Sequence, residues 1–125
     1  MIYDKNGEPF FLIFHRPKTG WELLKGRVDE GETREDALKR ELREKTRLSK
    51  YKIVKKLDVV QKVAESERLF NNEVFLIEAS MNIPVMPPQR INTYLWTKKD
   101  NALSKLQGTD KQLLEVALKD IMGSK

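Results

Sequence analysis

The run Phe-Phe-Leu-Ile-Phe at residues 10–14 restricts the fold more than any other segment of the sequence. It has the length of a strand and shows no helical period, so it predicts a β-strand. The Asn6-Gly7 dipeptide that precedes it favours a tight hairpin turn. Ile2 and Tyr3 are then the remnant of a preceding strand. We therefore expect the chain to begin with a β-hairpin.

Three later segments carry further strand signals. β-branched and aromatic residues alternate with polar ones over residues 51–64 and again over residues 68–79. Residues 93–97 form another strand candidate, and the prolines between positions 84 and 88 mark a loop before it. Together with the N-terminal hairpin, these segments predict a strand-rich domain.

Two segments carry helix signals. Thr33 and Asp36 form a Thr-x-x-Asp capping signature, which predicts a helix from Thr33 to about Thr46. From Asp110 to Met122, leucine, valine, alanine and isoleucine recur at helical spacing. Strands and helices together predict an α+β fold, or a mixed αβα arrangement. With 125 residues, the chain has the size of one domain, residues 1–125.

The composition excludes several kinds of active site. The chain has no cysteine, which removes disulfides, thiol nucleophiles and cysteine-based zinc sites. His15 is the one histidine of the sequence, so a multi-histidine metal site or a Ser-His-Asp triad is hard to build. Any metal bound by this chain would therefore need oxygen ligands.

Charge and hydropathy restrict the partners. The chain has 24 basic and 19 acidic residues, and its net charge of +5 is spread along the sequence without a basic block. Nucleic-acid-binding proteins usually concentrate their charge on one face or arm, so nucleic acid is not an expected partner. A mild positive field attracts phosphates and fits an anionic small molecule, but the same charge fits an ordinary well-solvated surface equally well. The sequence shows no long apolar run and no secretory signal, so we expect a cytoplasmic protein without a membrane partner.

The helix predicted after the Gly26–Gly31 loop carries a pair of carboxylates. Glu41 and Glu44 are three residues apart, so their side chains share one helix face and suit a hard divalent cation such as Mg²⁺. Arg40 is four residues from Glu44, and Glu32 is available to hold Arg40 by a charge-assisted hydrogen bond. The same spacing is also typical of an ordinary surface helix with many ion pairs. The spacing alone leaves both interpretations open.

This segment resembles the Nudix box, whose pattern is G-x5-E-x7-R-E-U-x-E-E-x-G-U, with U an aliphatic residue. Seven of the nine specified positions match at the correct spacing: Gly26, Glu32, Arg40, Glu41, Leu42, Glu44 and Leu48. The flanking segments are similar to the diadenosine tetraphosphate hydrolase branch of the family. They include a tryptophan and a Lys-Gly pair before the box, although Leu24 stands where that branch has a proline.

The resemblance implies the Nudix fold, a mixed sheet between helices, and an activity. Nudix hydrolases cleave a phosphoanhydride bond of a nucleoside diphosphate derivative, and dinucleoside polyphosphates are among the candidate substrates here. The reaction uses Mg²⁺ or Mn²⁺, which neutralises phosphate charge and activates water. By resemblance, Glu41 and Glu44 are the catalytic metal ligands, and Arg40 with Glu32 orients them.

Four further residues are candidate substrate contacts. By resemblance, Lys25 and Arg27 are candidates for contact with phosphate oxygens. Tyr94 offers an aromatic face on which a base can stack, although plain packing within its strand explains the residue equally well. Lys45 is the fourth, and it is also a departure from the family pattern. The resemblance leaves the oligomeric state open between a monomer and a homodimer.

Three departures from the family pattern support a second hypothesis. Lys45 replaces a glutamate that usually binds metal, and it lies four residues after Glu41, the favourable order for an ion pair. Arg90 stands where the resembled branch often has an acidic ligand. Arg47 replaces a glycine that ends the helix, so we expect a different helix exit.

Two hypotheses from different classes follow. In the first, the chain is a hydrolase in which Glu41 and Glu44 are joined by a substitute acid from the central strands, with Glu65, Glu67 and Glu73 as candidates. In the second, it is a catalytically impaired Nudix-fold module that binds nucleotide phosphates or has a regulatory role. There, lysine and arginine side chains take the place of the metal.

Overall fold

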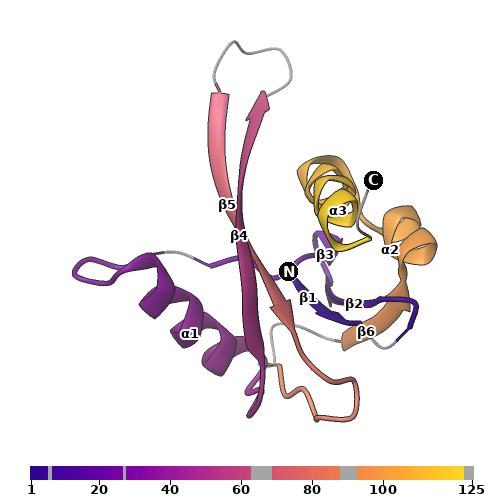
Figure 1. Cartoon of the computed structure of the whole chain (residues 1–125), viewed down its shortest axis with the longest axis horizontal. Coiled ribbons are helices and arrows are strands. Elements are labelled where there is room, and N and C mark those ends of the chain that lie inside the picture. Colours follow the sequence, from indigo (N-terminus) through magenta and orange to yellow (C-terminus); the bar gives the residue numbers. More distant parts are fainter. Residues whose placement is uncertain (6, 27, 63–68, 88–92, 123–125) are drawn as a thin grey trace.

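The computed structural model describes residues 1–5, 7–26, 28–62, 69–87 and 93–122 (Figure 1). Each predicted strand and helix is present, and the structure adds a short strand and a short helix that the sequence did not indicate. The elements in chain order are β1 (Ile2–Asp4), β2 (Phe10–Arg16), β3 (Gly20–Glu22), α1 (Arg34–Lys45), β4 (Lys52–Lys62), β5 (Leu69–Glu78), β6 (Thr93–Lys98), α2 (Lys99–Lys105) and α3 (Gly108–Ile121).

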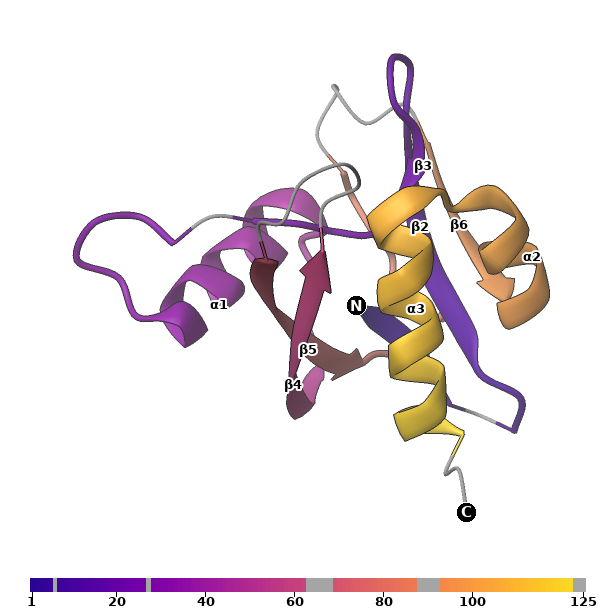
Figure 2. The same ribbon diagram turned by 90° about the horizontal axis from the view of Figure 1, so that it is seen from above.

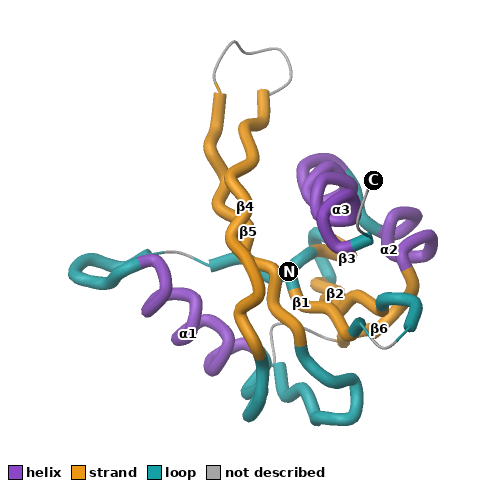
Figure 3. The backbone as a smooth tube through the Cα atoms, viewed as in Figure 1, coloured by secondary structure: helices purple, strands orange, loops and turns teal. Residues whose placement is uncertain are grey.

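The six strands form one mixed sheet. Its order is β3-β2-β1-β5-β4, and β6 pairs with β2. The predicted N-terminal hairpin is confirmed, because β1 and β2 are antiparallel and Gly7 in the turn has a φ of 84°. The pairing of β1 with β5 is parallel, which makes the sheet mixed. β4 and β5 form a long antiparallel hairpin that projects beyond the helices in Figure 3.

Helices cover both faces of the sheet, so the predicted αβα arrangement is confirmed. Figures 1 and 2 show α1 on one side and α2 with α3 on the other. Because neighbouring residues of a strand point to opposite faces, each buried strand contributes to two apolar clusters. The cluster under α2 and α3 includes Tyr3, Phe11, Ile13, Leu76, Ala102, Leu114 and Ala117. The cluster under α1 includes Ile2, Leu12, Phe14, Leu42 and Ile77.

Helix α1 begins and ends where its local sequence directs. The Oγ1 of Thr33 accepts a hydrogen bond from the backbone N–H of Asp36 at 3.1 Å, as the capping signature predicts. The helix closes at Thr46, whose side chain is fully buried and donates to the carbonyl of Leu42 at 2.6 Å. Within the described part of the chain, no helix is long and apolar enough to cross a membrane.

The expectation of a different helix exit is wrong. Arg47 takes up a left-handed backbone conformation with a φ of 54°, which is the conformation that glycine provides at this position in many helices. Its N–H and that of Thr46 both reach the carbonyl of Leu42, at 3.1 and 2.9 Å. The packing of the residues around the turn therefore imposes the same exit on an arginine.

We expect Arg47→Gly to stabilise the protein. A side chain in the left-handed region costs about 1–2 kcal/mol, and the larger unfolded-state entropy of glycine offsets about half of that gain. The free energy of unfolding in urea should rise by roughly 0.5–1 kcal/mol. Arg47→Ala keeps a Cβ atom and should give no such rise. Equal stabilisation by both substitutions would contradict the backbone explanation.

Candidate active site

The loop between β3 and α1 lies against the carboxylate side of the helix at Gly26. A Cβ atom at Gly26 would lie 2.6 Å from the Cδ atom of Glu41, closer than side-chain atoms approach one another. The backbone of the loop can therefore reach Glu41 only because residue 26 has no side chain. This close approach gives a physical reason for the first glycine of the box.

Arg40 joins the acidic residues of the loop and the helix. Its guanidinium donates two hydrogen bonds to Glu32, at 2.8 and 3.0 Å, which is the paired geometry that arginine and carboxylate groups favour. It also donates to Glu41 at 3.0 Å and to Glu44 at 3.1 Å. The structure thus brings Glu32, Arg40, Glu41 and Glu44 together. The Arg40–Glu32 bond expected from the sequence is present.

Lys45 completes this network from the next turn of α1. Its ammonium lies 2.8 Å from Oε2 of Glu41 and donates to the backbone carbonyl of Lys25 at 2.7 Å. Only 12% of the Lys45 side chain is exposed. Among the described residues, the Lys25 carbonyl accepts a hydrogen bond from this ammonium and Glu41 forms an ion pair with it, so the three donors of the group are not all used and a donor is left for a ligand. The cation that neutralises Glu41 is therefore part of the protein.

These contacts shift the pKa values of the site. Burial raises the pKa of Glu41, but the bonds from Lys45 and Arg40 outweigh it and hold the pKa below its usual range. The hydrogen bond from Arg40 is the main reason that the pKa of Glu32 is lowered, and the Asp29 N–H adds to it. The bond to Glu32 raises the pKa of Arg40 further. All three groups are charged at neutral pH.

The described residues do not fit a Mg²⁺ site. Nowhere in the described ranges do three or more aspartate, glutamate, histidine or cysteine side chains gather so that they could hold a metal ion. The Glu41 carboxylate already contacts two cationic side chains, and Glu44 contacts Arg40. Mg²⁺ usually binds proteins through one or two carboxylates together with water and phosphate oxygens, and the positive charge of the Lys45 ammonium beside Glu41 opposes its binding at that carboxylate.

Of the candidate substitute acids, only Glu73 lies in the described part of the chain, and it does not join Glu41 and Glu44. Glu73 lies on β5 at the other end of the helix face, where its carboxylate pairs with Arg34 at 2.6 Å and with Lys56 at 2.9 Å. It connects the first residue of α1 to the β4–β5 hairpin. Glu65 and Glu67 lie outside the described residues, as do Arg27 and Arg90.

The remaining predicted contacts lie on two different parts of the fold. The Lys25 side chain, 57% exposed, forms an ion pair of 2.9 Å with Asp110 at the start of α3. Tyr94 is on β6 opposite Phe14 and is 37% exposed, so its ring is open to a ligand. Asp110 is only 5% exposed, and the sequence assigned it no role because an acid in the first turn of a helix is common.

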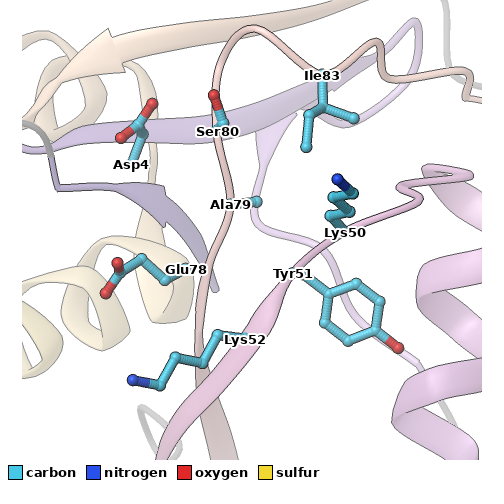
Figure 4. A pocket seen from close by; sticks show the side chains of 8 residues that line it. All are labelled: Asp4, Lys50, Tyr51, Lys52, Glu78, Ala79, Ser80 and Ile83. Carbon is cyan, nitrogen blue, oxygen red and sulfur yellow. The ribbon is translucent and has the colours of Figure 1, made fainter.

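A shallow pocket of about 360 Å³ lies apart from this site (Figure 4). It is formed where β1 and β5 end and β4 begins, and residues of both charges line it, including Asp4, Lys50, Lys52 and Glu78. None of the matched box residues contributes to it. The pocket therefore does not define the candidate active site.

The Arg40–Glu32 bond should make stability depend on pH. A carboxylate whose folded pKa is lowered stabilises the fold above its unfolded pKa, and this contribution disappears as the pH falls through the folded value. We expect the difference in free energy of unfolding between the wild type and Glu32→Gln to be constant near neutral pH. It should shrink as the pH falls below the ordinary value of 4.5. Urea unfolding at several pH values measures it, and a difference independent of pH would contradict the assignment.

Comparisons with known proteins agree with the geometry. The model of the NUDIX domain matches residues 1–115. Among solved structures, an Ap4A hydrolase binary complex from C. elegans superposes with a TM-score of 0.77 and 20% identity, covering 98% of this chain and 93% of that one. The E. coli dihydroneopterin triphosphate pyrophosphohydrolase gives a TM-score of 0.68 and 18% identity, with coverage of 92% and 88%.

A third structure holds a ligand. The NUDIX domain of Shewanella oneidensis NrtR, complexed with ADP ribose, gives a TM-score of 0.64 and 17% identity, covering 96% of this chain and 83% of that one. No curated protein sequence matches the chain significantly. The family match extends over most of the sequence and includes the glycine loop, the helix and the sheet described above. The chain therefore belongs to the Nudix hydrolase family.

Proposed function

We propose that this Nudix domain binds a nucleoside diphosphate derivative through its phosphates, without metal-dependent turnover. One observation carries the proposal: the Lys45 ammonium lies between the Glu41 carboxylate and the Lys25 carbonyl. A divalent cation bound to the Glu41 carboxylate would have to displace the ammonium. Because Lys45 is a covalent part of helix α1, it competes with any metal ion for Glu41.

The same arrangement favours a phosphate ligand. The remaining donor of Lys45 suits a phosphate oxygen, and the net charge of +5 adds a weak attraction for anions. We further propose that Lys25 and Arg27 contact phosphate and that Tyr94, with its exposed ring, stacks on a base. The bound ADP ribose of the NrtR domain and the name of the Ap4A hydrolase support this ligand class.

A second candidate is hydrolysis of a phosphoanhydride bond with Mg²⁺ or Mn²⁺. Two observations favour it. The Glu44 side chain is 54% exposed, so a metal ion can reach it, and Arg40, paired with Glu32, contacts both helix carboxylates and orients them. In this candidate, Glu41 and Glu44 are the metal ligands, as the family resemblance implies. Hydrolysis then requires Lys45 to leave Glu41.

Calorimetric titration and a turnover assay distinguish the two candidates. ADP-ribose, ATP and diadenosine tetraphosphate are titrated into the protein in EDTA and then in Mg²⁺ or Mn²⁺. We expect binding in EDTA and no release of mononucleotide or phosphate with either metal. Metal-dependent turnover that Glu44→Gln abolishes would support the hydrolase instead. Absence of binding under all conditions would reject the binding proposal.

A further inference from the structure

A buried carboxylate connects the C-terminal helix to the candidate site. Asp110 is in the first turn of α3, and its Oδ2 accepts a hydrogen bond from the backbone N–H of Leu23 at 3.2 Å. Its Oδ1 lies 2.9 Å from the ammonium of Lys25. Both partners belong to the short segment that leads from β3 into the box. In Figure 2, this segment passes the end of α3 on its way to α1.

The burial of Asp110 makes these contacts energetically important. A carboxylate that is 5% exposed is unfavourable unless it is hydrogen-bonded and paired. Leu23 and Lys25 supply one partner each, so the segment is held at two points two residues apart. Leu23 is itself buried in the apolar cluster under α2 and α3, which fixes the segment at a third point.

Lys25 contacts both Asp110 and Lys45, and it therefore links the position of Lys45 to that of Asp110. Its side chain is held by Asp110, while its backbone carbonyl accepts the hydrogen bond from the Lys45 ammonium at 2.7 Å. The position of that carbonyl sets the direction in which the ammonium points. Four residues thus connect α3 to α1, with the link between Lys25 and Lys45 made by the Lys25 backbone carbonyl: Asp110, Lys25, Lys45 and Glu41.

We infer that Asp110 is a positioning residue for the phosphate-binding site, through Lys25 and Lys45. The inference rests on the proposed function, in which the ammonium of Lys45 contacts the ligand. Asp110 does not touch the ligand in this scheme. It holds the Lys25 carbonyl so that Lys45 keeps one donor directed outwards, and α3 thereby contributes to phosphate affinity.

Titration of ADP-ribose in EDTA into Asp110→Asn tests the inference. Asparagine keeps an acceptor for the Leu23 N–H but loses the charge that holds Lys25. We expect the affinity to fall about tenfold, because the ion pair that holds Lys25 is lost. The matched control is Asp120→Asn, which makes the same change on the same helix. It breaks an ion pair of 2.7 Å with Lys55 on β4, and it should leave the affinity unchanged.

A double-mutant cycle separates positioning from general destabilisation. In Lys45→Met, the ammonium is absent, so adding Asp110→Asn should cause a smaller loss of affinity than it does in the wild type, and what remains is the loss at Lys25 itself. Equal losses in both backgrounds, or an unchanged affinity in Asp110→Asn alone, would overturn the inference. Circular dichroism of each variant shows whether it is folded.

NMR of the ammonium groups tests the positioning without a ligand. The Lys45 side chain is largely covered and its ammonium is hydrogen-bonded, which slows its exchange with water, so its signal should be present in the wild type and in Asp120→Asn. It should broaden or disappear in Asp110→Asn. If the Lys45 signal is lost in Asp110→Asn but the wild type binds no nucleotide in the titrations, the proposed function is rejected and the positioning of Lys45 by Asp110 is retained. A signal unaffected by Asp110→Asn would reject the positioning role alone.

Discussion

Lys45→Glu is expected to create a divalent-metal site on helix α1. The substitution removes the ammonium that pairs with Glu41 and places a third carboxylate on the face that holds Glu41 and Glu44. It also frees the carbonyl of Lys25, which is a further oxygen ligand. Mn²⁺ affinity, measured by calorimetry or by paramagnetic resonance, should rise by on the order of tenfold or more over the wild type.

Lys45→Met is the matched control for this prediction. It removes the same ammonium without adding a ligand, so its gain in Mn²⁺ affinity should be smaller than that of Lys45→Glu. The carboxylates of Lys45→Glu repel one another when no metal is present, and its free energy of unfolding should therefore rise when Mn²⁺ is added. A wild type that binds Mn²⁺ as tightly as Lys45→Glu would show that the ammonium does not keep metal from Glu41.

Gly26→Ala is expected to destabilise the protein by about 2 kcal/mol, the usual cost of forcing an extra methyl group into a packed contact. The new Cβ would lie 2.6 Å from Cδ of Glu41. Glu41 cannot simply turn away, because Arg40 and Lys45 hold its two carboxylate oxygens. Relief of the clash therefore breaks at least one of these ion pairs. Urea unfolding measures the loss of stability.

A second background shows whether the clash is the cause. In Glu41→Ala the atoms that meet the new Cβ are absent, so adding Gly26→Ala should cost much less than it does in the wild type. An equal cost in both backgrounds would mean that residue 26 is glycine for a reason of backbone conformation. Nucleotide affinity in EDTA should fall together with stability in Gly26→Ala, because Lys45 loses its position beside Glu41.

The helix and its charged face could be predicted because both depend on short-range geometry. The cap at Thr33, the shared face of Glu41 and Glu44, and the pairing of Glu41 with Lys45 follow from spacings of three or four residues. The strands with alternating residues could also be predicted, since apolar and polar side chains alternate every two residues along a half-buried strand. Helix α2 had no such signal, because it has seven residues and buries only Ala102.

The sequence by itself determined the family, the bounds of α1, and which acidic and basic side chains share its face. Only the tertiary structure decided that Arg47 keeps a left-handed exit, that Lys45 also bonds the Lys25 carbonyl, and that Asp110 is buried against this segment. The last two features join residues far apart in the chain: Lys45 and Lys25 are 20 residues apart, and Asp110 and Leu23 are 87 residues apart. No local spacing encodes such a contact, because it exists only once α3 and the loop after β3 pack on the same sheet.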